Sequence, residues 1–236
     1  MYRNMYWMDF NGHRNIDFDV QVVQRPNIPQ AKKRVTYVEI AGRDGTLTQT
    51  DDTYEDIDIK VPLNFLSNIN EHFMDKTRAL KNWLTGSGEL KFSDDIDVFY
   101  KVKNVYIDED IERVLRRAGF FTALFTCDPY TYYESGRVPS TIEECRINPY
   151  RFSKPVYHIV GEGNCRLTVN GTHFDANIGQ NLIIDTDMSL IYRENGQIQN
   201  TIARCYYPDF YLKPGENDIS ITEGFELRIK PNWRSL

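Results

Sequence analysis

The sequence predicts a mainly β protein of two domains, with one helix in the first. Apolar and polar residues alternate from Ile57 to Phe65, which is the pattern of a strand with one buried face. In the C-terminal half, Asn170-Gly171 and Asn195-Gly196 lie between alternating stretches, and this dipeptide is the strongest short hairpin signal. Apolar residues recur most clearly at helical spacing over Asn70–Leu84. We therefore expect a β-sandwich plus one helix in the N-terminal domain, and a second β-sandwich in the C-terminal domain.

The first strands of the N-terminal domain are separated by a glycine-containing turn. We expect a strand over Val35–Ile40 and then a turn over Ala41–Leu47, in which two glycines accept positive φ. The alternating segment follows as a long strand over Tyr54–Phe65. Pro62 cannot donate to a sheet ladder, so it indicates an edge or a bulge within this strand.

The predicted helix carries Phe73 and Trp83 on its apolar face. Asn68, followed three residues later by Glu71, resembles a capping box, and Asn70 is an alternative cap. Phe73 and Trp83 are candidate interface anchors if the chain assembles with other subunits, because aromatic residues often supply most of the binding energy of an interface. For Trp83 a place in the core of its own domain is the competing interpretation.

After the helix, strand patterns return at Leu90–Phe92 and again at Phe99–Val102, on either side of an acidic turn. The segment Asp108–Arg117 fits two structures. It could form a short charged helix, or it could be a strand that bends and continues into Phe120–Thr126.

A domain boundary is expected where alternation lapses and prolines cluster, between Pro139 and Pro155. This gives an N-terminal domain of residues 1–138 and a C-terminal domain of residues 139–236. Short strands with tight turns dominate the second domain, as in a β-sandwich. The expected strands are Val156–Val160, Arg166–Val169, Leu182–Asp185, Leu190–Arg193, Asp218–Ile221 and Phe225–Lys230.

Composition and motifs exclude several classes of function. A net charge of -6 argues against tight nucleic-acid binding, which depends on Lys and Arg neutralising phosphates. The longest apolar runs are too short to span a bilayer, so membrane insertion is not expected. Four cysteines without a CxxC pair predict free thiols, and four scattered histidines predict no metal site. Hydrolase, P-loop and dinucleotide motifs are missing, so we expect neither an enzyme nor a cofactor.

Three local features have both a structural and a functional interpretation. Gly161-Glu162-Gly163 is far more typical of a strand-end turn than of a dinucleotide loop, because no helix is expected after it. The acidic stretch Asp94–Asp97 fits a solvated turn better than a calcium loop. An aromatic run containing Tyr206, Tyr207 and Tyr211 could be a sugar platform or a partner contact, or it could be a loop packed on the sandwich.

Many short motifs occur in one order along nearly the whole chain. They are Phe10-Asn11-Gly12, Asp17-Phe18, Pro26–Pro29, Ile40–Leu47, Tyr54–Ile57, Trp83-Leu84 with Gly86, Gly88 and Leu90, Phe92–Asp95, Phe125–Tyr130, Lys154-Pro155, Gly161–Asn164, Val169–Gly171, Ile184-Asp185, Tyr192, Leu212–Asn217 and Pro231–Arg234. In this order they resemble the distal tail protein (Dit) family of siphophages, the phages with long, non-contractile tails. The second half of the chain is similar to that family's galectin-like domain.

The resemblance implies a structural virion protein at the tip of the phage tail, assembled in the cytoplasm of the bacterial host. Such proteins form a homo-hexameric ring with a central channel for DNA. The ring joins the tail tube protein to the tail-associated hub protein, and a belt-like extension of each N-terminal domain clasps the next subunit. The galectin-like domains project outward and can carry adsorption apparatus, which makes a receptor-binding protein a further partner.

The assembly candidates from the sequence are the polar face of the long strand and the apolar face of the helix. We expect Asp56, Asp58 and Lys60 to face the channel or the next subunit, since a negative, wet surface would keep passing DNA from sticking. A carbohydrate-binding adsorption module that recognises host cell-wall glycans is the alternative function, with its sugar face at Tyr206, Tyr207 and Tyr211. A cell-wall hydrolase is a third hypothesis, which the missing motifs disfavour.

Overall fold

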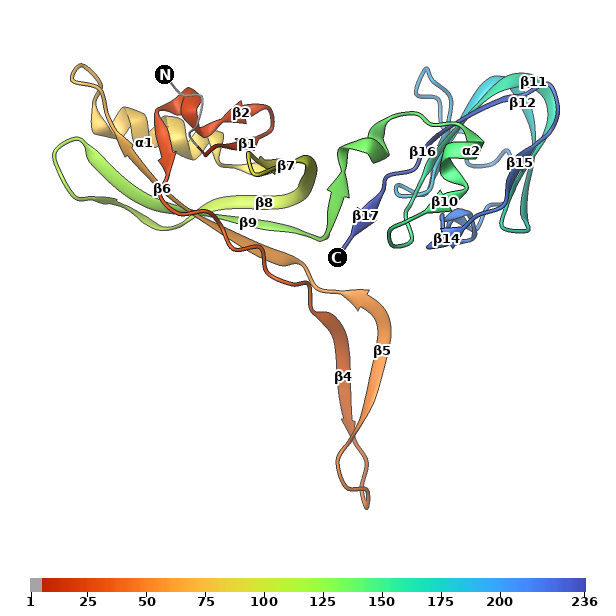
Figure 1. Cartoon of the computed structure of the whole chain (residues 1–236), viewed down its shortest axis with the longest axis horizontal. Helices are drawn as coiled ribbons and strands as arrows, with labels where there is room; N and C mark the ends of the chain where they lie inside the picture. The colour runs from red at the N-terminus through yellow and green to blue at the C-terminus, as the bar shows by residue number, and fades with distance from the viewer. Residues whose placement is uncertain (1–5) are drawn as a thin grey trace. The chain divides into compact units, whose positions relative to one another are not determined.

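The computed structural model describes residues 6–236, apart from the side chain of Glu109. It is mainly β, as predicted from the sequence, and its sheets are antiparallel (Figure 1). The chain divides into two compact units, one reaching to Thr131 and one of residues 132–235. The boundary between the two units therefore lies before the segment Pro139–Pro155, near the end of strand β9 (Ala118–Tyr133). The positions of the prolines did not predict this strand.

Seven strands of the first unit form one sheet in the order β2-β1-β7-β8-β9-β6-β3. Asn11-Gly12 makes the tight turn between β1 and β2, with positive φ at both residues. The acidic turn at Ser93-Asp94 joins β7 to β8. The strands are β1 (Met8–Phe10), β2 (His13–Arg14), β3 (Val20–Val22), β6 (Ile57–Leu66), β7 (Gly86–Phe92), β8 (Asp95–Arg113) and β9 (Ala118–Tyr133). A 3₁₀ helix, Asn15–Phe18, precedes β3.

The alternation of β6 is confirmed. Five residues at every second position are buried, from Ile57 to Phe65, and the residues between them are not. The buried face meets β9, where Ile59 lies opposite Phe125 and Val61 opposite Ala123. Each such side chain contributes roughly 1.5–3 kcal/mol when it leaves water. Pro62 lies next to the point where β3 stops pairing, so the first half of β6 is an edge, as the proline indicated.

Helix α1 spans Phe73–Trp83 and so begins later than the sequence suggested. His72 is the N-cap, and its side chain makes no capping hydrogen bond. One hydrogen bond of the expected capping box is present, in a turn that precedes the helix. In it the Asn68 N–H donates to the Glu71 carboxylate at 3.3 Å. Glu71 also lies 3.6 Å from the buried ammonium of Lys76. The chain thus forms a turn over Asn68–Glu71 where a further helical turn was expected.

The ambiguous segment after Asp108 is a strand. β8 continues to Arg113, the chain turns over residues 114–117, and β9 begins at Ala118. The second of the two interpretations is therefore correct.

A separate hairpin joins β3 to β6. Its strands, β4 (Lys33–Glu39) and β5 (Thr46–Tyr54), pair only with each other. The first strand and the turn at Gly42 and Gly45 were expected, and both glycines have positive φ. The strand β5 was not expected, because its run of threonine, glutamine and aspartate has no apolar alternation.

The second unit is organised around one long hairpin. β11 (Val156–Val169) and β12 (Thr172–Asp185) pair along their whole length, and Asn170-Gly171 forms the two-residue turn, as predicted. β13 (Leu190–Tyr192) pairs with β12, while β15 (Ile219–Ile221) and β16 (Glu226–Lys230) pair with opposite ends of β11. The remaining elements are β10 (Ile147–Asn148), β14 (Gly215–Glu216), β17 (Arg234–Ser235), α2 (Ile142–Cys145) and the 3₁₀ helices Glu134–Arg137 and Tyr207–Phe210.

Two of the expected strands, Val156–Val160 and Arg166–Val169, are parts of β11. The Gly161-Glu162-Gly163 motif lies inside this strand, so the interpretation as a strand-end turn is wrong. Both glycines have positive φ, and a Cβ on Gly161 would come within 2.4 Å of the Phe225 ring. Glycine lets the strand bend here without breaking its ladder to β12. β11 can therefore pair with β16 before the bend and with β15 after it.

The bend makes a prediction about stability. We expect Gly161→Ala to lower the free energy of unfolding by about 1–3 kcal/mol, because the new Cβ meets the Phe225 ring at an unfavourable φ. Gly179→Ala is the matched control on the partner strand, since a Cβ there meets only the guanidinium at the end of the Arg193 side chain, at 3.3 Å, and no aromatic ring. Denaturant unfolding followed by circular dichroism measures both variants. Equal stability of the two would show that Gly161 does not hold the bend.

Candidate assembly surfaces

The outer face of β6, β8 and β9 is a charged surface on the first unit. Asp56, Asp58 and Lys60 are all exposed on it, directly behind the buried face of β6. The side chains predicted to face a channel or a neighbour therefore lie on the surface of their own unit and outside its core.

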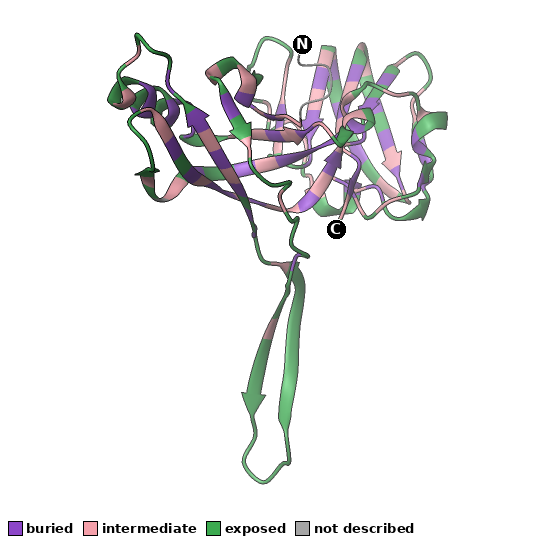
Figure 2. Ribbon diagram, turned by 60° about the vertical axis from the view of Figure 1, so that its left-hand side comes forward, coloured by how far each residue is buried: buried purple, intermediate pink, exposed green. Residues whose placement is uncertain are grey.

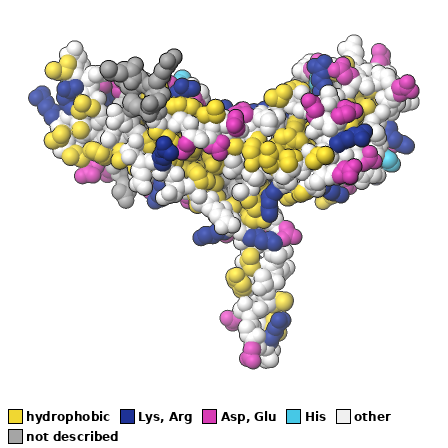
Figure 3. Space-filling model, in the orientation of Figure 1, with side chains coloured by type: hydrophobic (Ala, Val, Ile, Leu, Met, Phe, Trp, Pro, Cys, Tyr) yellow, Lys and Arg dark blue, Asp and Glu magenta, His cyan; other side chains and the backbone are white. Residues whose placement is uncertain are grey.

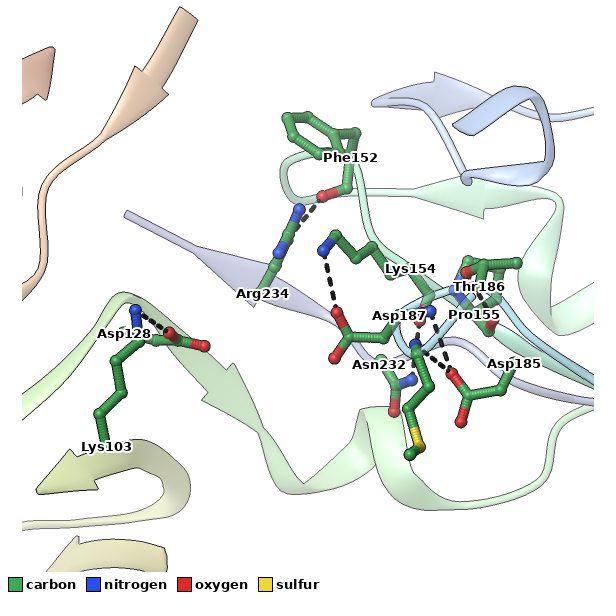
Figure 4. A network of polar contacts seen from close by, with 11 residues as sticks. Lys103, Asp128, Phe152, Lys154, Pro155, Asp185, Thr186, Asp187, Asn232 and Arg234 are labelled. Carbon is green, nitrogen blue, oxygen red and sulfur yellow. Dashed lines mark hydrogen bonds and ion pairs between the residues drawn. The ribbon is translucent and has the colours of Figure 1, made fainter. Parts of the chain in front are cut away.

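Ion pairs and hydrogen bonds tie this charged face together across the strands. The Lys103 ammonium lies 2.6 Å from Asp56 and 3.2 Å from Asp128, and the second contact is drawn in Figure 4. Lys60 donates to Asp108 at 2.9 Å. Thr126 donates its hydroxyl hydrogen to Asp58 at 2.7 Å, directly across the ladder.

Within this network of contacts the balance of charge is negative, since two lysines meet four aspartates. Partial burial alone would lower the pKa of Lys103, but its hydrogen bonds to Asp56 and Asp128 outweigh this and raise that pKa. On the other side of the sheet, burial and then the carboxylates of Asp128, Asp58 and Asp56 raise the pKa of Cys127 to about 12. All four cysteines are free thiols, as expected, and Cys127 is an inert one.

Almost every residue of the hairpin of β4 and β5 is exposed (Figure 2), and apolar side chains lie among polar ones on its surface (Figure 3). Tyr37 is 67% exposed, and Ile40 is exposed near the turn. Val38 and Leu47 lie directly opposite each other and are both exposed. A lone two-stranded hairpin is marginally stable in water. We therefore expect this hairpin to become more stable when another surface covers its apolar residues.

A second apolar surface lies where β6 ends and β9 begins. Leu66 is 60% exposed, and Phe120 is also exposed beside it. A hollow of about 570 Å³ opens here, next to the edge strand β3. Its lining combines the ends of three strands with the preceding 3₁₀ helix: Ile16, Asp17, Asp19, Val20, Gln21, Asn64, Phe65, Leu66, Asn68, Ala118 and Phe120.

The two aromatic candidates on helix α1 differ in position. Trp83 is only 8% exposed and stacks on Phe18, with ring centroids 4.4 Å apart. The core interpretation therefore fits Trp83 better than a role as an exposed anchor. Phe73 is partly exposed, and its ring packs on that of Phe65 with the centroids 5.3 Å apart. The central carbon of the Arg113 guanidinium lies 4.6 Å from the centroid of the Phe73 ring. Phe73 thus remains the candidate that a neighbour could reach.

The three tyrosines of the aromatic run have three different environments. Tyr206 is 69% exposed, whereas Tyr207 packs against the core of the second unit. Tyr211 stacks on Phe152 with a centroid distance of 6.0 Å. The Arg234 guanidinium lies over the Phe152 ring and its Nε donates to the Phe152 carbonyl (Figure 4). Stacking on Phe152 fits the packed-loop interpretation of Tyr211, and the three rings do not share one partner.

Other classes of site are not seen in the described part of the chain. Among these residues no group of three or more His, Cys, Asp or Glu side chains is placed to hold a metal ion. No helix among them has the length and hydropathy to cross a membrane.

The position of Trp83 makes a prediction about stability. We expect Trp83→Ala to lower the free energy of unfolding by about 3–5 kcal/mol, because it removes a large buried side chain. Phe73→Ala is the comparison on the same helix and should cost less, since Phe73 is only partly buried. Denaturant unfolding at a protein concentration where the chain is monomeric measures both. A Trp83→Ala variant as stable as the parent would contradict the core interpretation.

Comparisons with known proteins agree with this geometry. Residues 14–127 match the family model described as phage tail protein RIFT-related domain. A comparison with curated proteins gives no significant match. Among solved structures, the Dit (gp 19.1) protein of phage SPP1 is similar over 98% of this chain and 99% of its own, with a TM-score of 0.66 and 15% identity.

Two baseplate structures are also similar. A chain of the phage P2 baseplate in its activated conformation with Ca aligns with a TM-score of 0.54 and 9% identity, over 98% of this chain and 97% of that one. A chain of the phage p2 baseplate in its activated conformation with Sr aligns with a TM-score of 0.52 and 9% identity, over 96% of this chain and 98% of that one. Residues 14–127 are thus similar to the phage tail protein RIFT-related domain, and the chain as a whole has a fold similar to that of the SPP1 Dit protein.

Proposed function

We propose that the chain is a distal tail protein, a structural, non-catalytic subunit of a phage virion that forms a hexameric ring at the end of the tail. The tail-protein domain in the first unit and the SPP1 Dit fold of the whole chain support this role. The SPP1 protein is described as a paradigm of the hub adsorption apparatus in phages that infect Gram-positive bacteria. The partners of this chain would be a tail tube protein above the ring and a hub protein below it, with a receptor-binding protein as a further partner.

The observation that carries the proposal is the uncovered hairpin of β4 and β5. A ring requires a heterologous interface, in which two different surfaces of each subunit match. The hairpin supplies one surface, with exposed apolar residues such as Tyr37 and Leu47. The hollow beside Leu66 and Phe120 offers apolar side chains among polar ones, and the open edge of β3 lies next to it. We therefore assign the hairpin to the clasp between neighbouring subunits, with this hollow as its receiving surface.

The charged face with Asp56, Asp58 and Lys60 suits the wall of the channel. DNA carries a dense negative charge, and a protein binds it tightly only by neutralising phosphates with Lys and Arg. On this face the lysines are already engaged by aspartates, and the balance of charge is negative. Such a wall would let DNA pass without retaining it.

A carbohydrate-binding role at Tyr206, Tyr207 and Tyr211 has less support. The three rings are held in separate environments, so they offer no common platform for a sugar.

The clasp makes a prediction about assembly. The unaltered chain should give a native mass of six 27.7 kDa subunits, or twice that for stacked rings, as concentration rises. We expect Leu47→Asp to weaken this assembly at least tenfold, because it would bury a charge where an apolar side chain docks. Melting should be unchanged, since Leu47 is exposed within its own chain. Light scattering and native mass spectrometry measure the mass.

The matched control is Met188→Asp, which places the same charge on an exposed apolar residue of the second unit. It should leave the mass unchanged. A Leu47→Asp variant that assembles like the parent would rule out the hairpin as the clasp, and a parent that stays monomeric at every concentration would count against a self-assembling ring.

A further inference from the structure

The sheet of the first unit has two edges, and they differ in how their backbone groups are occupied. β6 pairs with β9 along its whole length but with β3 only over Leu63–Phe65, so its first half is left as one edge. The other edge consists of β2 and the first half of β7, because β1 pairs with β7 only over Leu90–Phe92. Open backbone N–H and C=O groups at a sheet edge are a template on which another chain can add a strand.

Asn11 continues the ladder of β7 at the point where β1 turns away. Its backbone N–H donates to the Glu89 carbonyl at 3.0 Å. Its side-chain oxygen accepts from the Glu89 N–H at 2.9 Å, and its side-chain nitrogen donates to the Ser87 carbonyl at 3.1 Å. In a continuing antiparallel strand, the backbone of residues 11 and 13 would make these last two bonds. The amide of one side chain thus takes the place of a further strand.

The sequence supplies both the amide and the space for it. Asn11 has a φ of 55°, a left-handed conformation that asparagine adopts more readily than most residues. Gly12 completes the turn, and its N–H donates to the Asp9 carboxylate at 2.8 Å. A Cβ on Gly88 would overlap the side-chain amide of Asn11. Glycine at position 88 therefore leaves room for the amide against the strand.

The rest of this edge, strand β2, is two residues long. Its Arg14 N–H donates to the Asp17 carboxylate at 2.8 Å. At β7 and at β2, a side chain therefore occupies backbone groups with which an added strand would pair.

We infer that Asn11 determines the specificity of assembly, because it closes the β7 edge to strand addition by a second copy of the chain. The strand that a second copy can offer is the hairpin of β4 and β5, since its two strands pair only with each other. With the β7 edge closed, the hairpin is directed to the β3 side of the sheet, where the receiving hollow lies. The choice of the hairpin rests on the proposed clasp, whereas the closing of the β7 edge does not.

Self-association of full-chain variants tests the inference, with Leu47→Asp present in each so that the clasp does not contribute. Asn11→Gly removes the side-chain amide and keeps a residue that accepts positive φ, so it should fold. We expect sedimentation equilibrium to show self-association at least about tenfold tighter than that of Leu47→Asp alone, because the β7 edge is now open. Gly88→Ala should have the same effect by displacing the amide.

Hydrogen exchange followed by NMR locates the contact. The Glu89 amide should be protected in Leu47→Asp alone, where Asn11 accepts its hydrogen bond. In the added presence of Asn11→Gly, it should exchange rapidly in dilute solution and become protected again as the chain associates.

Asn170→Gly is the matched control in the second unit. Asn170 holds the same position of an Asn-Gly turn, and its N–H and side-chain oxygen both bond to the backbone of Asp218. Its loss frees no strand edge, because the N–H of the preceding residue, Asn217, donates to the Arg146 carbonyl at 2.7 Å. This variant should lose stability without associating.

Three results would overturn the inference. One is unchanged self-association in both Asn11→Gly and Gly88→Ala. Another is equal association of Asn170→Gly, because lost stability would then be the cause. The third is association that leaves the Glu89 amide unprotected, since the contact would lie elsewhere. If Leu47→Asp alone assembles like the unaltered chain, the clasp fails, while the effect of Asn11→Gly is still measured as the difference between the two variants.

Discussion

The ten-residue pairing of β6 with β9 is the constraint on which the first unit depends. It places Ile59 and Val61 against Phe125 and Ala123, and it turns Asp58 and Lys60 to the opposite side. A slip of one residue would exchange these two faces, exposing the core and burying the charges. The core and the candidate channel wall are therefore two consequences of a single register. The ion pairs of the charged face can contribute little to stability by themselves, since exposed pairs are typically worth less than 1 kcal/mol.

The hairpin of β4 and β5 differs from this sheet in what stabilises it. Its strands exchange backbone hydrogen bonds but bury almost no side chain, so the ribbon gains little from the hydrophobic effect in a single chain. A covering neighbour would supply that burial and also pair or shield the open edges. The same exposed residues that make the hairpin marginal in one subunit thus favour association between subunits. If the proposed clasp forms, local instability and assembly are linked properties of one segment.

The sequence predicted best where one strand has one buried face. The alternation of β6 and the turn at Asn170-Gly171 follow from local rules, and both are confirmed. The hairpin turn at Asn11-Gly12 obeys the same rule and could have been predicted in the same way. β5 was missed because a strand exposed on both faces has no apolar period. The late start of α1 at Phe73 was also missed, because apolar periodicity does not fix the residue at which a helix begins.

The candidate surfaces were harder to predict, since they depend on register between strands far apart in the sequence. Asp56, Asp58 and Lys60 could be found, because they interrupt a visible alternation. The bonds from the Asn11 side chain to β7 could not, because its partners lie 76 and 78 residues further along the chain. In the second unit, the glycines at 161 and 163 keep β11 continuous through its bend. Before the bend, β11 pairs with β16, and after it the strand turns to β15. The sequence predicted that the strand ends at these glycines. If it did, the hairpin turn at Asn170-Gly171 would no longer set the register of the residues before the bend. The glycines thus fix which residues of these strands lie opposite one another.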